Sequence, residues 1–253
     1  MVQEHFEGNA QFVMVMAGES HSVVVGSKDG IWIWDNGGCL GHSDIADKHV
    51  LTLLAGLPFD GGKVVMVAAG GGHTATVTGK GVLWDLCYNQ SGQLRTAGFA
   101  QVKLTPARVG DADVFGGSQV RKVACSHKVT LIVTEEGSLS WYDHGSKGAI
   151  GHNSMDNQAV PTQVKSKHLE DVVIVSAAAG AFYSAVVTEN GCLYPWEKTA
   201  LENAFSAGLG HDDMHTTLLP KRPWAICVTA GGARQRRYCG SPSGRGPRSQ
   251  STH

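Results

Sequence analysis

A short sequence pattern occurs four times along this 253-residue chain, and its copies lie 51 to 56 residues apart. Each copy has a stretch of small apolar residues, then a β-branched run, a turn that ends in glycine, and a tryptophan. The turn glycines are Gly30, Gly81, Gly137 and Gly191, and the tryptophans are Trp34, Trp84, Trp141 and Trp196. A period this long is typical of propellers and related arrays, so the repeat constrains the architecture before any residue is considered for chemistry.

The copy from Val172 to Trp196 shows what each unit is expected to form. Its apolar and β-branched runs predict three short strands, and Glu189-Asn190-Gly191 predicts a tight turn between the last two. Glycine is expected in such a turn because it adopts a positive φ without a Cβ clash. We therefore predict an all-β fold in which three or four antiparallel strands form each blade of a β-propeller. The blades are expected at about 13–63, 64–119, 120–173 and 174–227, with a fifth beginning at 228.

The order of the motifs resembles the regulator of chromosome condensation repeat. The matching features are Val-Ala-Ala-Gly, His-Ser or His-Thr, the turn glycine, Leu-x-x-Trp, the segment Asn89–Leu94, and Pro-x-x-Val at Pro106. The resemblance covers about Val13 to Gly231 and implies a propeller, which has seven blades in that family. Two other propeller repeats fit less well. The tryptophan–aspartate repeat is only ~40–45 residues long, and the glycine doublets of a kelch repeat do not recur here in register.

The copies differ at two positions of the pattern. Gly18, Gly70 and Gly180 end the first motif in three copies, but Ser126 stands there in the third. Three residues later are His21 and His73, then Val129 and Tyr183. A position that accepts valine is not a metal-ligand position, so we expect the histidines to be hydrogen-bonded inside each blade.

The end of the chain differs in composition from the repeats. Up to Gly231 there are 16 Lys and Arg against 22 Asp and Glu, whereas the last 22 residues contain five arginines and no acid. This Gly-, Ser- and Pro-rich stretch is expected to be disordered over 232–253 because it cannot bury enough apolar surface. The change inside a repeat favours a reading-frame slip or misjoined exon over a biological basic tail. If the chain is complete, two blade faces lack neighbours, and we expect the molecule to associate with itself or with a partner, or to be poorly stable.

No pattern for catalysis, cofactor binding or metal binding is found in the sequence. There is no Gly-x-Ser-x-Gly elbow and no paired Cys/His spacing, and Gly70-Gly71-Gly72-His73 lacks the Gly-Lys-Ser/Thr of a phosphate loop. His42, His152 and His211 share one repeat position, which places them on separate blades. We therefore predict no cofactor, no metal and no enzyme chemistry of these kinds.

Six scattered cysteines, no secretion signal and no long apolar run predict reduced thiols, no membrane span, and a cytoplasmic or nuclear location.

Two function classes remain open. The first is a non-catalytic protein-interaction module or regulatory scaffold, which fits the lack of catalytic motifs. The second, implied by the resemblance, is a guanine-nucleotide exchange factor for a Ran-like small GTPase, with chromatin association as a further role. The acidic body disfavours direct binding to nucleic acid. The candidate interaction loop lies between repeats and includes Asp111, Asp113, Gly116 and Gly117.

Overall fold

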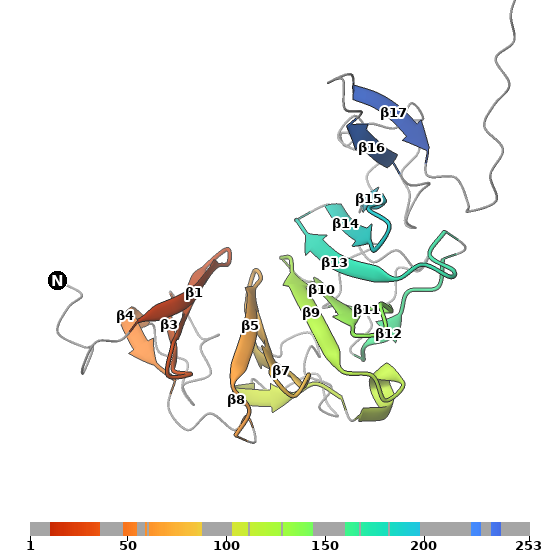
Figure 1. Cartoon of the computed structure of the whole chain (residues 1–253). Helices are drawn as coiled ribbons and strands as arrows, with labels where there is room; N and C mark the ends of the chain where they lie inside the picture. The colour runs from red at the N-terminus through yellow and green to blue at the C-terminus, as the bar shows by residue number, and fades with distance from the viewer. Residues whose placement is uncertain are drawn as a thin grey trace, which may run out of the picture.

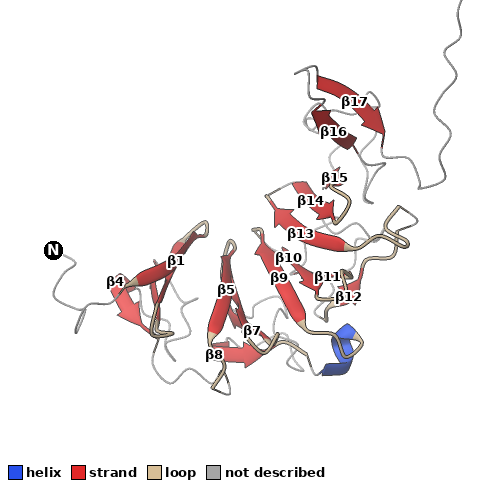
Figure 2. Ribbon diagram, viewed as in Figure 1, coloured by secondary structure: helices blue, strands red, loops and turns tan. Residues whose placement is uncertain are grey.

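The computed structural model describes residues 11–35, 48–54, 59, 61–87, 103–110, 112–127, 129–143, 160–166, 168–181, 183–197, 224–228 and 234–238. In these ranges the chain is nearly all β-sheet, and a 3-10 helix at Ala112–Phe115 separates the second and third sheets. The four antiparallel sheets stand side by side in an arc (Figure 1, Figure 2). The predicted all-β propeller architecture is confirmed, and each sheet is one blade.

Every blade uses its strands in chain order. Blade 1 consists of β1 (Phe12–Ala17), β2 (His21–Gly26), β3 (Ile31–Asp35) and β4 (Lys48–Leu53). Blade 2 consists of β5 (Val64–Ala69), β6 (His73–Thr78), β7 (Leu83–Cys87) and β8 (Lys103–Arg108). Blade 3 consists of β9 (Val120–Cys125), β10 (Val129–Thr134), β11 (Leu139–Asp143) and β12 (Thr162–Gln163). Blade 4 begins with β13 (Ile174–Ala179), β14 (Tyr183–Thr188) and β15 (Leu193–Glu197).

The turn between the second and third strands is one residue out of register with the expectation in blade 1. The equivalent second strands begin 52, 56 and 54 residues apart, at His21, His73, Val129 and Tyr183. The positive-φ position of the turn is filled by Gly81, Gly137 and Gly191, but by Asp29 in blade 1, with φ 64°. Gly30, predicted to be the turn glycine, is the next residue. Aspartate tolerates this backbone conformation better than most residues, so the motif shifts without losing its turn.

The four repeat tryptophans are not all equivalent, contrary to the expectation. Strand pairing aligns Trp34 with Trp196, because they pair with Ser22 and Ser184, the second residues of β2 and β14. Trp84 pairs with Thr76 and Trp141 with Leu131, so they lie two and one positions earlier in their strands. A shift of one residue moves a side chain to the other face of a strand. Trp84, Trp141 and Trp196 are nevertheless all buried, whereas Trp34 is partly exposed.

The hydrophobic core lies between blades. One cluster joins Val23, Val25 and Ile33 of blade 1 to Val64 and Leu86 of blade 2, among others. Two further clusters join blade 2 to blade 3 and blade 3 to blade 4 in the same way. In each junction the second and third strands of one blade cover the first strand of the next. We call these the trailing face and the leading face of a blade.

Two further strands follow β15 along the chain. β17 (Arg234–Tyr238) pairs antiparallel with β16 (Trp224–Val228), and β16 joins β15 through Leu193 and Trp224. β17 lies within the segment 232–253 that is expected from its composition to be disordered, and its ladder uses backbone amides and carbonyls, which arginine-rich segments also possess. Val228, expected to begin a fifth repeat, ends β16 in the sheet of blade 4. Residues 239–253 lie outside the described residues.

Among the described cysteines, Cys125 and Cys192 differ in the state of their sulfur atoms. Cys125 is a free thiol, and Cys192 is disulfide-bonded. The expectation of reduced thiols is wrong for Cys192, because spacing along the chain does not reveal which cysteines the fold brings together. In the described part of the chain, no helix has the length and apolar character needed to cross a membrane.

Gly137 and Gly191 provide a matched test of packing between blades, because both have positive φ, 81° and 77°. A Cβ on Gly137 would lie 2.5 Å from Val173 Cγ1 and 2.9 Å from the Ile174 amide nitrogen of blade 4, whereas nothing lies within 4 Å at Gly191. Both alanine variants incur the backbone cost of about 1 kcal/mol. We expect Gly137→Ala to lose about 2 kcal/mol more unfolding free energy than Gly191→Ala because of overpacking. Urea unfolding measures the difference, and equal losses would contradict this junction.

Candidate functional site

The turn between the first and second strands of blade 1 lies directly against the same turn of blade 2, which in turn lies against that of blade 3. A Cβ on Gly18 would lie 2.3 Å from the Gly70 carbonyl oxygen, and one on Gly70 would lie 2.3 Å from the Ser126 carbonyl oxygen. Gly180 has no such neighbour, and its Cβ would meet only the Tyr183 carbonyl at 3.5 Å. Glycine is therefore required at positions 18 and 70, where the backbone of the next turn lies this close.

Backbone hydrogen bonds join the first turns of blades 1, 2 and 3 into one edge. The Glu19 amide donates to the Gly70 carbonyl at 3.0 Å, and the Gly71 amide donates to the Ser126 carbonyl at 3.1 Å. The Ser20 hydroxyl adds a bond to the Gly71 carbonyl at 3.1 Å. The positions of the turns are thus determined by neighbouring blades as well as by their own strands.

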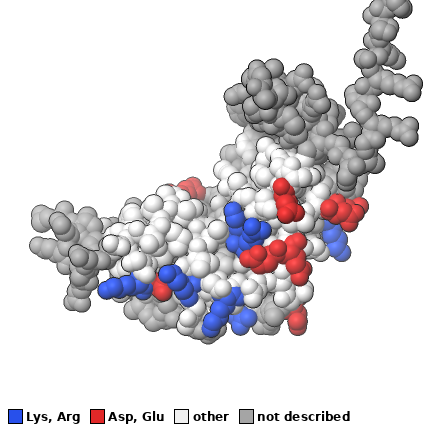
Figure 3. Space-filling view, viewed as in Figure 1, with Lys and Arg blue, Asp and Glu red and all other residues white. Residues whose placement is uncertain are grey.

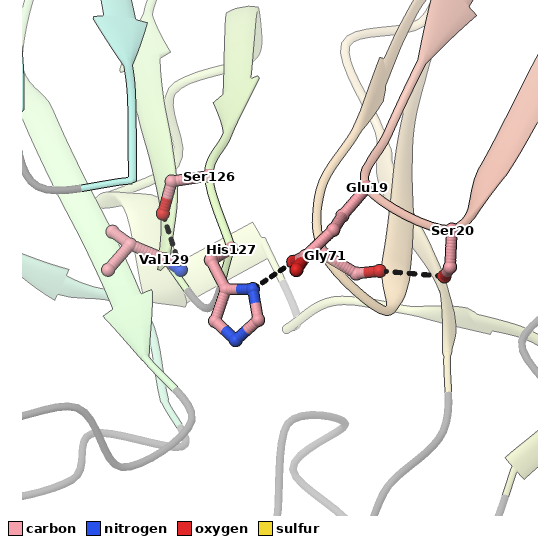
Figure 4. Close-up of polar contacts among 6 residues, drawn as sticks. All are labelled: Glu19, Ser20, Gly71, Ser126, His127 and Val129. Atoms are coloured by element: carbon pink, nitrogen blue, oxygen red, sulfur yellow. Dashed lines mark hydrogen bonds and ion pairs between the residues drawn. The ribbon is translucent and has the colours of Figure 1, made fainter.

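Ser126 explains how the third copy manages without glycine. In all four turns the amide at this position donates to the carbonyl three residues later, at 2.7–2.8 Å. The Ser126 side chain stays within its own turn, where its Oγ accepts from the Val129 amide at 3.0 Å (Figure 4). The turn needs only the backbone carbonyl of residues 21, 73, 129 and 183, so the side chain at that position is able to vary.

The two repeat histidines join adjacent blades, which corrects the expectation of bonding inside each blade. His21 Nε2 shares a hydrogen bond of 2.7 Å with Thr74 Oγ1 of blade 2, and His73 Nε2 shares one of 2.9 Å with Thr130 Oγ1 of blade 3. Both rings are buried. Burial lowers the pKa of His21 to about 4. Burial, aided by the charges of His21 and His127, lowers the pKa of His73 to about 3.

The junction between blades 2 and 3 contains a second buried polar contact between side chains. The Tyr142 hydroxyl donates to Asp85 Oδ2 at 2.7 Å, while Asp85 Oδ1 is buried without a hydrogen-bond partner. Burial raises the pKa of Asp85 to about 7, although the bonds from Tyr142 and the Leu86 backbone oppose the shift. Burial also raises the pKa of Tyr142, helped by the Asp85 charge. These groups are too enclosed to meet a partner, so their role is structural.

The first turns of the four blades lie on the inner side of the arc (Figure 1), and they line a hollow. Its volume is about 570 Å³, and its lining consists of the three-residue stretches 17–19, 69–71, 125–127 and 179–181. Glu19, Gly71, His127 and Ala181 are the equivalent residues in the four turns. The Glu19 carboxylate contacts His127 Nδ1 across blade 2 (Figure 4). Gly71 lies between them, and a Cβ there would be 2.7 Å from His127 Nδ1. A missing side chain in one copy therefore permits a carboxylate–imidazole contact between two others.

Charge is distributed unevenly around this hollow. Figure 3 shows most Lys, Arg, Asp and Glu side chains on the outer side of the arc, whereas the surface near the first turns is largely uncharged. In the described residues, no group of three or more His, Cys, Asp or Glu side chains is arranged to hold a metal ion. The hollow is thus an open, mostly neutral surface with one carboxylate and one imidazole at its edge.

The candidate loop of the sequence lies away from the hollow, on the outer side of the arc (Figure 2). Asp113 is exposed in the 3-10 helix, and Gly116 and Gly117 have positive φ with nothing within 4 Å of a Cβ. Asp111 lies outside the described residues, as do His42, His152 and His211. Glu19 and His127 were not singled out from the sequence, although they directly follow the aligned Gly18 and Ser126. The signal that could have identified them is a position that directly follows an aligned residue of the repeat and differs in every copy.

Known proteins resemble the chain over most of its length. No protein-family model matches it. It is 29% identical over 231 residues to the ultraviolet-B receptor UVR8 of Arabidopsis thaliana, covering 90% of this chain and 49% of the receptor. It is 26% identical over 246 residues to the protein RCC2 homolog of Danio rerio, covering 87% and 47%. The mitochondrial RCC1 domain-containing protein RUG3 of Arabidopsis thaliana is 33% identical over 133 residues, covering 53% and 28%.

The chain spans about half the length of the first two of these relatives. Among solved structures, human WBSCR16 matches with a TM-score of 0.71 and 21% identity, over 86% of this chain and 54% of that one. Yeast RCC1 (Prp20), in a structure with Kap60, matches with a TM-score of 0.68 and 20% identity, over 86% and 49%. These structures share the fold of the described blades.

The buried histidines predict that stability falls on acidification. Because the pKa values of His21 and His73 are lowered in the folded state, protons bind the unfolded chain first as pH falls below 6.5. Each histidine then lowers the free energy of unfolding by up to about 1.4 kcal/mol per pH unit, until the pH reaches its pKa in the folded state. Asp85 has the opposite effect on stability between pH 3.8 and about 7. Its pKa is raised in the folded state, so as the pH falls the folded chain binds this proton before the unfolded chain does. We expect His73→Val, the residue used in blade 3, to flatten the loss between pH 6.5 and 4.5.

Urea unfolding at several pH values measures this slope. The Val variant also leaves Thr130 without its histidine, so its stability at pH 7.5 is expected to fall by about 1–2 kcal/mol. Comparing slopes rather than absolute stabilities separates the two effects. A variant with the wild-type slope would show that His73 is not a buried neutral group.

Proposed function

Because the chain is built from the repeats of the regulator of chromosome condensation (RCC1) family, we propose that it is a non-catalytic protein-interaction module or regulatory scaffold. Its partner binds at the hollow formed by the first turns of blades 1–4. The observation that supports this most directly is the convergence of four equivalent but chemically different residues, Glu19, Gly71, His127 and Ala181, at one edge of the arc.

The backbone of this edge is suited to recognition because it is held before a partner arrives. Hydrogen bonds from one turn to the next set the spacing of Glu19, Gly71 and Ser126, so little conformational entropy remains to be lost on binding. The buried positions of the repeat maintain the blades, whereas the positions facing the hollow are able to vary in charge and size. Such a division allows one fold to present different binding surfaces.

The shape and chemistry of the hollow favour a protein partner over a small substrate. A small-molecule site is commonly an enclosed, largely apolar cavity with a few polar groups that fix orientation. Here the side chains of Glu19 and His127 are 62% and 48% exposed, and the lining is mainly backbone and small residues. A peptide loop that offers a cationic or hydrogen-bonding group to Glu19 would complement this surface.

Glu19→Arg tests the site against a matched control. Glu189 is an exposed acid in the turn between β14 and β15, outside the lining of the hollow, so Glu189→Arg makes the same charge change elsewhere. We expect Glu19→Arg to reduce recovery of protein partners from a cell extract by about tenfold or more, as loss of a central charged contact does. Glu189→Arg should recover them as the wild type does. Equal recovery with both variants would place the partner site elsewhere.

A second candidate function is guanine-nucleotide exchange on a Ran-like small GTPase, with chromatin association as a further role. The family resemblance suggests it, and the exposed 3-10 helix with Asp113 and the two uncovered glycines supplies a protruding element. Exchange needs no acid, base or nucleophile of its own, because a surface that stabilises the empty GTPase is sufficient. A cytoplasmic or nuclear location would suit either function.

Release of labelled GDP separates the two functions. The interaction-module proposal expects a Ran-like GTPase to release GDP at its intrinsic rate in the presence of micromolar chain. Faster release, abolished when residues 111–117 are replaced by a Gly-Ser link of equal length, would instead favour exchange and assign it to that loop. The Gly137→Ala variant provides a control for indirect effects of reduced stability.

A further inference from the structure

Blade 1 exposes a leading face that is buried in blades 2 and 3. Phe12 and Val15 on β1 are 43% and 67% exposed. Their equivalents in the next two blades, Val64 with Val67 and Val120 with Val123, are at most 8% exposed. The difference arises because β5 and β9 are covered by the blade before them, whereas no described residue covers β1 in this way.

Blade 4 presents the complementary trailing face in a less covered state than the other blades. Val187 on β14 is partly exposed, whereas its equivalents Val25, Val77 and Val133 are at most 1% exposed. Leu193 on β15 is likewise partly exposed, although Ile31, Leu83 and Leu139 are buried. The Gly191 turn is open, while Gly81 and Gly137 are contacted by the next blade.

The three internal junctions show how these two faces fit. At each junction apolar residues of the second and third strands pack on the first strand of the next blade. The Gly81 carbonyl accepts from the Val120 amide at 2.9 Å, and the Gly137 carbonyl accepts from the Ile174 amide at 3.0 Å. At the end of blade 4 the equivalent acceptor is the Gly191 carbonyl. The Ala181 amide in the first turn of blade 4 is equivalent to the Glu19 and Gly71 amides, which donate to the next blade.

We propose that a second copy of this chain docks head to tail, so that the leading face of its blade 1 covers the trailing face of blade 4. The two faces are complementary because they are further members of a contact that the chain already makes three times. Two copies joined at both ends would form a ring of eight blades, within the 4–8 blades typical of closed propellers. Such a ring leaves neither face exposed.

Sedimentation velocity of the 253-residue chain between about 1 and 100 μM tests for this association. The wild type is expected to sediment as a dimer at the upper concentrations. Val15→Glu places a charge in the proposed junction, and we expect it to weaken association by about tenfold or more. Val50→Glu is the matched control, because Val50 on β4 is 59% exposed and its equivalent Val160 is also exposed, outside the blade junctions.

A mixing experiment distinguishes head-to-tail contact from a symmetric one. Val15→Glu damages the leading face, and Val187→Glu damages the trailing face, so each variant alone has no intact pair of faces. When the two are mixed, one junction pairs two undamaged faces. We expect each variant to be monomeric and their mixture to form a dimer that grows no further. A symmetric interface through β1 would instead let Val187→Glu dimerise on its own, because its β1 is undamaged.

Circular dichroism and thermal unfolding first establish that each variant is folded. Leu193→Ser replaces Val187→Glu if the latter loses its β-sheet signal. A wild-type chain that stays monomeric to 100 μM would overturn the proposal. So would a Val15→Glu chain that associates like Val50→Glu, or a mixture that fails to dimerise.

Discussion

Contact between consecutive blades is the interaction on which the rest of this structure depends. A four-stranded sheet has two faces but only one layer, so it needs a neighbour to bury its apolar side chains. Here the trailing face of each of blades 1–3 meets the leading face of the next, and all three hydrophobic clusters are shared between blades. The turns, the buried polar groups and the hollow all follow from this stacking.

The stacking geometry is repeated while its chemistry changes. At the equivalent position on the third strand, the residue facing the next blade is Ile33 in blade 1, Asp85 in blade 2 and Trp141 in blade 3. Ile33 shares a cluster with Leu86, Asp85 accepts from Tyr142, and Trp141 shares a cluster with Trp196. Each residue is matched by its partner across the junction, so the junctions keep one geometry with three kinds of contact. A buried acid is tolerated where a hydroxyl is available to it.

The candidate binding surface also combines a constant backbone with side chains that vary between blades. Interblade hydrogen bonds between turn amides and carbonyls hold the edge of the hollow, and they do not depend on which side chains project from it. Glu19 and His127 meet because Gly71, between them, has no side chain. The chemistry of this edge is therefore a property of three blades together, and of no single repeat.

The repeat period, the β-branched runs and the turn glycines determined the blade architecture from the sequence, because strand formation and positive φ are local properties of the chain. Local patterns did not determine the register, which placed Asp29 rather than Gly30 at the turn and separated Trp84 and Trp141 from Trp34. Nor did they show that His21 reaches Thr74, that Arg234–Tyr238 forms a strand, or that Glu19 lies beside His127. Each of these features depends on a segment that is distant in the chain or on a neighbouring strand. Only the stacking of blades decided them, since it alone sets which side chains of different repeats face one another.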